Sequence, residues 1–489
     1  MIEMFVPDLS RFASGIIAAG QAPPIGWIAP FALLLLCIAI LPLTRRASHW
    51  WEHNRNKLLV GLLLGAAALW HYQSRPFGVL LHNDVLVRAM SAAGVPLTHA
   101  HGHTATPPGL PAALGALGNA MMEYLPFILF LFSLYCISGG IVLRGDLPAH
   151  PVTNTAFLVI GGLAANLIGT TGASMLLIRP LLQTNSERRH VVHTVIFFIF
   201  IVSNVGGSLL PFGDPPLFLG FLRGVPFLWT LHLALPWACM MSALLLIYYL
   251  WDCRVYATET LRDVARDEQA LQKLRLLGSV NFLWLAGVTA AVVLLDAKKT
   301  MPGTNWTPPS FLREAVMLAL VGASFLTTPR GLRHASGFNF VAIGEVACLF
   351  VGLFITMQIP LEILQARGAE LGLTKPWHFF WMTGILSSFL DNAPTYLVFF
   401  ETANAMTQDA GPGITPLLDG RYIRQDLLEA ISLGAVFMGA NTYIGNGPNF
   451  MVKSIAVQSG VKMPGFFGYM LYSGSILIPL FLLITLMLK

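Results

Sequence analysis

The sequence predicts an all-α polytopic membrane protein with about ten crossings. Only 11% of the 489 residues are charged and 55% are hydrophobic, whereas roughly 25% of residues are charged in an ordinary soluble domain. Five stretches contain no Asp, Glu, Lys or Arg: 25–43, 191–213, 224–251, 276–295 and 463–488. Each is long enough for a helix to cross the bilayer core, which needs about 18 residues. This composition excludes a set of water-facing domains and a disordered chain.

The net charge of +5 does not indicate nucleic-acid binding, because the basic residues lie in loops, as in the cytoplasmic loops of membrane proteins. The five cysteines are scattered without a CxxC spacing, which is typical of small buried residues. We interpret His99, His101 and His103 as an accidental cluster in an exposed loop. The sequence lacks a Walker A motif and any recognisable hydrolase arrangement. It therefore predicts neither an enzyme nor a cofactor.

The predicted organisation has five parts. They are an interfacial N-terminal segment at 1–24, first helices with a long outside loop at 25–116, repeat 1 at 117–251, an inter-repeat linker with two helices at 252–337, and repeat 2 at 338–489. Crossings are expected at 25–43, 57–72, 117–142, 192–222, 231–251, 280–296, 311–327, 338–358, 430–459 and 466–488. The basic loops 44–57 and 252–279 should be cytoplasmic. We therefore expect both termini outside a bacterial inner (plasma) membrane.

Two further apolar segments, 154–183 and 377–407, are interrupted by polar tips. The tips are Gly169-Thr170-Thr171-Gly172 and Asp391-Asn392-Ala393-Pro394. An arm of about 14 residues reaches roughly 20 Å as a helix, which is too short to cross a core of about 30 Å. The pattern therefore predicts two re-entrant hairpins.

An internal repeat relates the two halves of the chain. Residues 131–141 resemble residues 349–359, and each segment precedes a hairpin and then a helix broken by glycine and proline. The broken helices are expected at 192–222 and 430–459. On the crossing count the two units start on opposite sides, so the repeats are inverted. Interrupted segments at matching places indicate the central site of a secondary transporter.

Two aspartates are the main candidates for chemistry. Asp391 and Asn392 lie in an otherwise apolar arm, where a carboxylate costs at least ~2.5–3.5 kcal/mol on insertion scales. We expect Asp391 to meet a cation, a proton or a polar cavity, and the alternative is a cap that starts the second arm. Asp214, between Gly213 and Pro215, is either a second functional carboxylate or an N-cap.

Small polar side chains complete the expected site, with helix–helix packing as their alternative role. They are Thr170, Thr171, Ser203, Asn204, Thr395, Asn441, Thr442, Asn446 and Asn449. We expect an Na⁺ site at Asp391, Asn392 and Asn441, because oxygen ligands freed at helix breaks suit this ion. Arg179 and Lys453 are possible charge partners of the aspartates or ligands of an anion. Their alternative role is snorkelling from the end of a membrane arm.

These motifs resemble the ion transporter superfamily over roughly residues 115–489. They are Ser203-Asn204-Val-Gly-Gly-Ser, Gly213-Asp214-Pro-Pro, Asp391-Asn392-Ala-Pro and Gly445-Asn446-Gly-Pro-Asn449. The superfamily includes NhaD-like sodium/proton antiporters, arsenite permeases and citrate or dicarboxylate transporters, and the chain looks most similar to the NhaD-like branch. The resemblance implies a homodimer with elevator-type alternating access. The first hairpin departs from the NhaD-like pattern, because it lacks an Asp-Asn pair.

The leading hypothesis is sodium/proton antiport, in which Asp391 binds Na⁺ and H⁺ in turn and Asp214 is its partner. The alternative is a cation-coupled carrier of an anion, either citrate or dicarboxylate or an arsenite-type oxyanion, held by half-helix N-termini. A membrane-embedded enzyme or sensor is disfavoured by the repeat. The expected partners are therefore the lipid bilayer, transported Na⁺ and H⁺ or a small anion, and a second copy of the chain, with no nucleic acid.

Overall fold

The protein is an all-α membrane protein, and 72% of its computed structural model is helical. The structure describes residues 23–44, 47–51, 53–81, 83–100, 103–260, 272–295, 306–335, 338–367, 372–407, 411–418 and 420–488. The expectations for residues 1–22, for the basic residues at 45–46, and for His101 and residues 261–271 fall outside this part of the chain.

Four helices within the described residues are long and apolar enough to cross a membrane. They are Leu110–Ser138, Pro151–Thr184, Phe227–Tyr256 and Phe466–Thr485. The pair Ile343–Thr356 and Gln358–Leu364, bent by 43°, would make a fifth span if both parts cross together. Shorter apolar helices occur at Ile25–Ile38, Val192–Ser208 and Val280–Leu294. About ten crossings would require shorter and broken helices to act as spans, and that number stays a prediction.

One compact unit comprises residues 1–128 and 340–372. Its elements are η1 (Ile25–Ile28), α2 (Ala29–Ile40), η2 (Leu41–Leu43), α3 (Ser48–Trp51), α4 (Asn54–Ser74), β1 (Leu80–Leu81), α5 (Asp84–Ala92), β2 (Thr98–Ala100), β3 (His103–Ala105), the first part of α6 (Leu110–Ser138), α15 (Val341–Thr356) and α16 (Gln358–Arg367). Helix α4 is joined by ion pairs to α15, from Lys57 to Glu345 at 2.6 Å, and to α16, from Arg75 to Glu362 at 2.7 Å.

The long outside loop expected between the crossings at 57–72 and 117–142 has structure of its own. It contains α5 and a small antiparallel sheet of strand order β1-β3-β2. Asn83 caps α5, because its side chain accepts a hydrogen bond from Val85 N. In the same sheet, His99 Nδ1 lies 2.9 Å from Thr104 Oγ1. These elements were not predicted from the sequence, because they are short and amphipathic and carry no long apolar run.

A second compact unit comprises residues 129–339 and 373–489. Its helices are the rest of α6, α7 (Pro151–Thr184), α8 (Val192–Ile201), η3 (Val205–Ser208), α9 (Pro215–Leu222), η4 (Phe227–Leu233), α10 (Ala234–Tyr256), α12 (Val280–Leu294), α13 (Leu312–Thr327), α14 (Arg330–Ala335), α17 (Pro376–Phe389), α18 (Asn392–Ala405), α19 (Gln425–Met438), η6 (Gly439–Asn441), α20 (Gly447–Gln458) and α21 (Phe466–Thr485). Its strands β4 (Val142–Asp146) and β5 (Gln272–Leu277) pair antiparallel, as do β6 (Ile414–Pro416) and β7 (Tyr422–Arg424).

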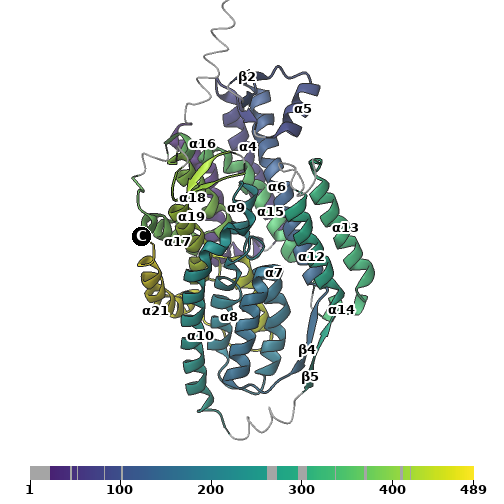
Figure 1. Ribbon diagram of the computed structural model, residues 1–489, viewed down its shortest axis with the longest axis vertical. Coiled ribbons are helices and arrows are strands. Elements are labelled where there is room, and N and C mark those ends of the chain that lie inside the picture. The colour runs from purple at the N-terminus through teal and green to yellow at the C-terminus, as the bar shows by residue number, and fades with distance from the viewer. Residues whose placement is uncertain are drawn as a thin grey trace, which may run out of the picture. The chain divides into compact units, whose positions relative to one another are not determined.

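Helix α7 turns back on itself at Gly169, whose φ of 76° and ψ of 154° are open to glycine but hardly to other residues. Asn154 Nδ2 donates to Asn185 Oδ1 at 2.9 Å, although the two residues are 31 positions apart. A straight helix would separate them by about 46 Å. The two arms therefore lie antiparallel, beside α8 and α10 (Figure 1).

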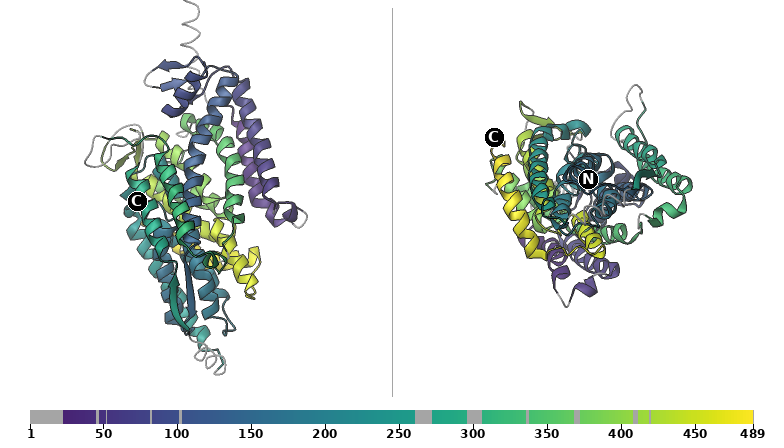
Figure 2. Two further views of the ribbon diagram at one scale, coloured as in Figure 1. Left: turned by 90° about the vertical axis from the view of Figure 1, so that its right-hand side faces the viewer. Right: turned by 90° about the horizontal axis from the view of Figure 1, so that it is seen from below.

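Helices α17 and α18 form a second pair that folds back at Leu390 and Asp391, both in extended backbone. Two other helices are interrupted: α8 gives way to η3 and then α9, and α19 gives way to η6 and then α20. Proline lies in the first turn of both α9 and α20, where the missing N–H has no intrahelical partner to lose. Away from these breaks, α12 and α13 pack against each other (Figure 2).

Candidate functional site

A cluster of hydrogen bonds is centred on Asp214, which is 1% exposed and occupies the N-cap position of α9 without a side-chain capping bond. Its Oδ1 accepts from Thr170 Oγ1 at 2.9 Å and from Asn446 Nδ2 at 3.0 Å, and its Oδ2 accepts from Asn392 Nδ2 at 2.5 Å. The three donors come from the tip of the α7 hairpin, the α19–α20 break and the α17–α18 break. All three are neutral, so the carboxylate is bonded without a cationic partner in this set.

The two interrupted helices also contact each other directly. Asn204, in the α8–α9 break, donates from Nδ2 to Asn449 Oδ1 at 2.7 Å and accepts at Oδ1 from Asn446 Nδ2 at 3.2 Å. Asn449 in turn donates to the carbonyl oxygens of Gly439 and Thr442, both at 2.9 Å. These amides bond the carbonyls that the interruption of a helix leaves without partners, and so they hold both breaks open.

The α7 hairpin joins the cluster at two further points near its tip. Ser174 Oγ lies 2.8 Å from Ser203 Oγ, and Thr170 N donates to Gly213 O at 2.8 Å. A Cβ at Gly206 would collide with the backbone of Gly162, so glycine allows the first break to approach the hairpin closely. The side chain of Thr171 is partly exposed and lies outside this set of hydrogen bonds.

At the second hairpin, Asp391 caps α18 and is partly exposed. Its Oδ1 accepts from Ala393 N at 3.2 Å, and its backbone oxygen accepts from Thr395 Oγ1 at 3.1 Å. The capping role and a role in ion binding are compatible, because the cap uses only one carboxylate oxygen.

Ser388 connects the second hairpin to the α19–α20 break, and the sequence analysis did not single it out. Its Oγ accepts from Asn441 Nδ2 at 2.9 Å, and its backbone oxygen accepts from Thr442 Oγ1 at 2.5 Å. Ser388 is a small polar residue in an otherwise apolar arm. The only sequence signal for it was its position three residues before Asp391.

Two buried amide oxygens in this region have no hydrogen-bond partner among the described residues, Asn392 Oδ1 and Asn441 Oδ1. A buried polar atom without a partner costs roughly 1–3 kcal/mol, which a bound cation would offset. Amide oxygens are hard ligands that suit such ions. These two residues are members of the Na⁺ site expected from the sequence, whose third member is Asp391.

The two basic residues considered as charge partners of the aspartates make other contacts in the described part of the chain. Lys453 Nζ is 4.4 Å from the centre of the Tyr443 ring, an arrangement typical of a cation–π contact. Arg179 lines a surface cavity together with Arg144. Neither side chain is among the hydrogen-bond partners of Asp214 or Asp391 in the described part of the chain.

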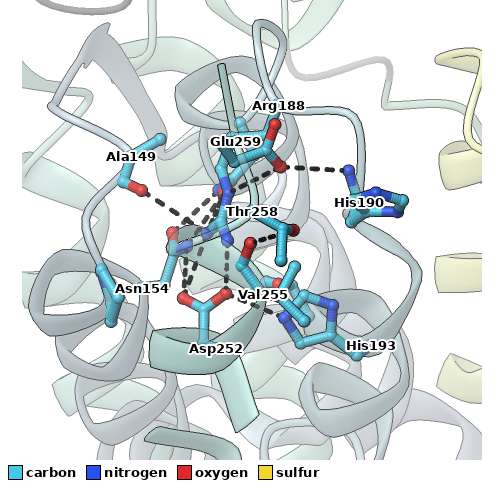
Figure 3. A network of polar contacts seen from close by, with 12 residues as sticks. Ala149, Asn154, Arg188, His190, His193, Asp252, Val255, Thr258 and Glu259 are labelled. Carbon is cyan, nitrogen blue, oxygen red and sulfur yellow. Dashed lines mark hydrogen bonds and ion pairs between the residues drawn. The ribbon is translucent and has the colours of Figure 1, made fainter. Parts of the chain in front are cut away.

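A buried charged cluster, which the sequence analysis missed, fixes the base of the α7 hairpin (Figure 3). Asp252, at the end of α10, accepts from Arg188 Nη2 at 2.7 Å, from His193 Nε2 at 2.8 Å and from Asn154 Nδ2 at 3.2 Å. Asn154 and Asn185 also exchange hydrogen bonds of 2.9 and 2.8 Å. A signal was present in the sequence, since Arg188 and Asp252 flank two of the charge-free runs.

A second buried acid, Glu401, lies in α18. Its carboxylate forms ion pairs with Arg223 at 2.6 Å and with Arg421 at 3.0 Å, and its side chain is 0% exposed. These pairs join the end of α9, α18 and the β6–β7 ribbon. These ion pairs hold α9 and α18 together at a second position, in addition to the contact at Asp214.

Comparison with known proteins adds one finding. A sequence family described as "Putative citrate transport" matches residues 20–88 and 104–488. No curated protein matches the chain. The family description refers to citrate and not to sodium/proton exchange, so the expected similarity to the NhaD-like branch is not confirmed.

Proposed function

Because the chain belongs to the family described as "Putative citrate transport", we propose that this membrane transporter moves a citrate-like polycarboxylate together with Na⁺ or H⁺. The cation binds at Asp214 and Asp391, and the polycarboxylate binds beside them. Transport is secondary, driven by the gradient of the coupled cation. The observation that carries the proposal is the buried carboxylate of Asp214, bonded by neutral donors from three other segments.

The coupling role of Asp214 follows from its surroundings. A buried carboxylate is costly without a compensating charge, and its partners here are two amides and one hydroxyl. A proton or an Na⁺ ion supplies the missing positive charge and leaves when the site opens to water. The unpartnered oxygens of Asn392 and Asn441 are further ligands for such an ion.

The anion role rests on three helix N-termini. Asp214, Asp391 and Asn446 are the N-caps of α9, α18 and α20, and hydrogen bonds to Asp214 bring two of these ends to the third. Helix N-termini carry a partial positive charge and free N–H groups, which favour bound carboxylates. An anion held there, next to a cation at the aspartates, makes the loaded site nearly neutral.

The architecture that we propose for this transport has ten crossings and an inverted repeat. Re-entrant hairpins α7 and α17–α18 and broken helices α8–α9 and α19–α20 meet at mid-membrane, and an elevator-type step alternates their access. A homodimer in the inner membrane, with both termini outside, completes the proposal. The proposal is supported by the hydrogen bonds that join the two hairpin tips and the two helix breaks. All four lie in the same compact unit.

The test uses purified protein in vesicles and labelled citrate. We expect an inward Na⁺ or proton gradient to drive citrate accumulation. Asp214→Asn and Asp391→Asn should each abolish it while the protein stays folded, and Asp84→Asn, on the exposed face of α5, should not change it. Gradient-driven citrate uptake retained by Asp214→Asn would contradict the proposal.

Sodium/proton antiport is the second candidate, favoured by the neutral donors around Asp214 and by the unpartnered oxygens of Asn392 and Asn441. The same vesicles distinguish it, because an antiporter dissipates a proton gradient when Na⁺ is added without any anionic substrate. Asp391→Asn should then abolish this Na⁺-dependent proton movement. If Na⁺ alone moves no protons while citrate uptake proceeds, antiport is excluded.

A further inference from the structure

A surface cavity of about 420 Å³ is lined by the second arm of α7 and the β4–β5 ribbon, and none of its lining residues belongs to the Asp214 cluster. Its polar lining comes from Arg144 on β4, Arg179 and Gln183 on α7, and Gln272 on β5. Its apolar lining includes Met175 and Leu176 of the same α7 arm. A cavity of this size is within the usual range for small-molecule sites, which is about 300–1,000 Å³.

Positive charge collects at this cavity without an acidic partner in the described part of the chain. Arg144 and Arg179 are exposed, and neither forms an ion pair or side-chain hydrogen bond with any described residue. The nearest acid on the ribbon, Asp146, is buried and follows an irregularity in the strand pairing. Among the described residues, neither guanidinium group therefore has a partner that would compete with a ligand.

The register of the ribbon is an independent observation. Arg144 pairs directly with Arg275 across β4 and β5, and directly opposed residues of an antiparallel pair project from the same face. Like charges in this position destabilise a strand pair. Of the two opposed arginines, Arg144 lines the cavity together with Arg179. An anion would stabilise this arrangement, because planar guanidinium groups bind phosphate and carboxylate with paired hydrogen bonds.

We propose that this cavity is a second anion site, in which Arg144 and Arg179 bind a phosphate- or carboxylate-bearing group and the amides of Gln183 and Gln272 donate further hydrogen bonds. The site is separate from the proposed transport site and does not depend on the transported substrate. Met175 and Leu176 provide apolar contact for a ligand that also has a hydrocarbon part. The ligand links the α7 hairpin to the ribbon.

Two sources can supply this chemistry, an anionic phospholipid headgroup or a free polyanion. The first arm of the experiment measures binding of phosphatidylglycerol to purified protein in phosphatidylcholine nanodiscs, by native mass spectrometry. The second arm titrates inorganic phosphate into protein in phosphatidylcholine nanodiscs and follows thermal stability. The variant is Arg144→Gln/Arg179→Gln, and the matched control is Arg254→Gln, which changes an exposed arginine outside the cavity.

We expect the double variant to bind one of the two probes at least tenfold more weakly than wild type, with the control within twofold of wild type. Loss in the first arm identifies the lipid as the source, and loss in the second identifies a free anion. Equal binding of both probes by the double variant and by the control would overturn the proposal. Wild-type binding must also weaken as NaCl rises from low to high concentration, because salt screens exposed charges. Salt-independent binding would overturn it without any variant.

Discussion

Replacing Asp252 by alanine should destabilise the protein by about 3–5 kcal/mol, the range expected when one partner of a buried ion pair is removed. The side chain of Arg188 is 4% exposed and that of Asp252 is 0% exposed. Arg188 donates to both carboxylate oxygens, at 2.7 and 3.1 Å. Without Asp252 this guanidinium stays buried while its main anionic partner is gone.

The structure places the effect near the lower end of that range. Glu259 remains, with its Oε1 3.8 Å from Arg188 Nε, and a carbonyl oxygen, that of Ala149, lies 3.4 Å from Nη1. These groups compensate part of the charge. The Asn154 amide and the His193 ring would each lose one hydrogen bond as well, and a typical net loss is about 1 kcal/mol for such a bond. We therefore expect about 3 kcal/mol or slightly more.

The assay is reversible unfolding in mixed detergent micelles, applied to Asp252→Ala, Arg188→Met and the double variant Arg188→Met/Asp252→Ala. The double variant should be less destabilised than the sum of the single changes, because it buries no unpaired charge. Asp84→Ala on exposed α5 should stay within about 0.5 kcal/mol of wild type. A loss below about 1 kcal/mol for Asp252→Ala, or simple additivity, would refute the reasoning.

Three further outcomes are expected. Gly169→Ala should lower stability by about 1–3 kcal/mol because of its backbone conformation, whereas Gly474→Ala, whose Cβ would meet nothing within 4 Å, should not; thermal unfolding compares them. Asn446→Ala removes a donor to Asp214 and should slow transport in vesicles at least tenfold, so a rate within twofold of wild type would contradict its role. Glu401→Gln, which neutralises an acid bonded to two arginines, should destabilise by about 1–2 kcal/mol in the same micelles, and an unchanged midpoint would show that these pairs contribute nothing.

Local sequence patterns were sufficient to predict where the helices are interrupted. Glycine, proline and small polar residues mark the tip of α7 and the two broken helices, because each acts on the backbone within a few residues. The same patterns indicated Thr170, Asn204, Asp214 and Asn446, which the structure brings into one cluster. The prediction of a membrane protein required only the long charge-free runs, which are typical of helices that cross a bilayer.

The two aspartates differ in burial and hydrogen bonding in a way that only the tertiary structure shows. The sequence favoured Asp391, because it interrupts an apolar arm, but the structure buries Asp214 at the centre of the hydrogen bonds and leaves Asp391 partly exposed. Asn392 and Asn446 contact Asp214 across separations of 178 and 232 positions. No local pattern reports such contacts.

The membrane environment and the positions where helices stop could be predicted from the sequence alone, because apolar length and backbone preferences are properties of short segments. Which charges are compensated depends on contacts that form when the helices pack. The tertiary structure pairs Arg188 with Asp252 and leaves Arg144 and Arg179 without an acid among the described residues. The partners of a charged side chain come from distant positions in the chain. Whether the charge is paired can therefore be seen only when the helices are packed.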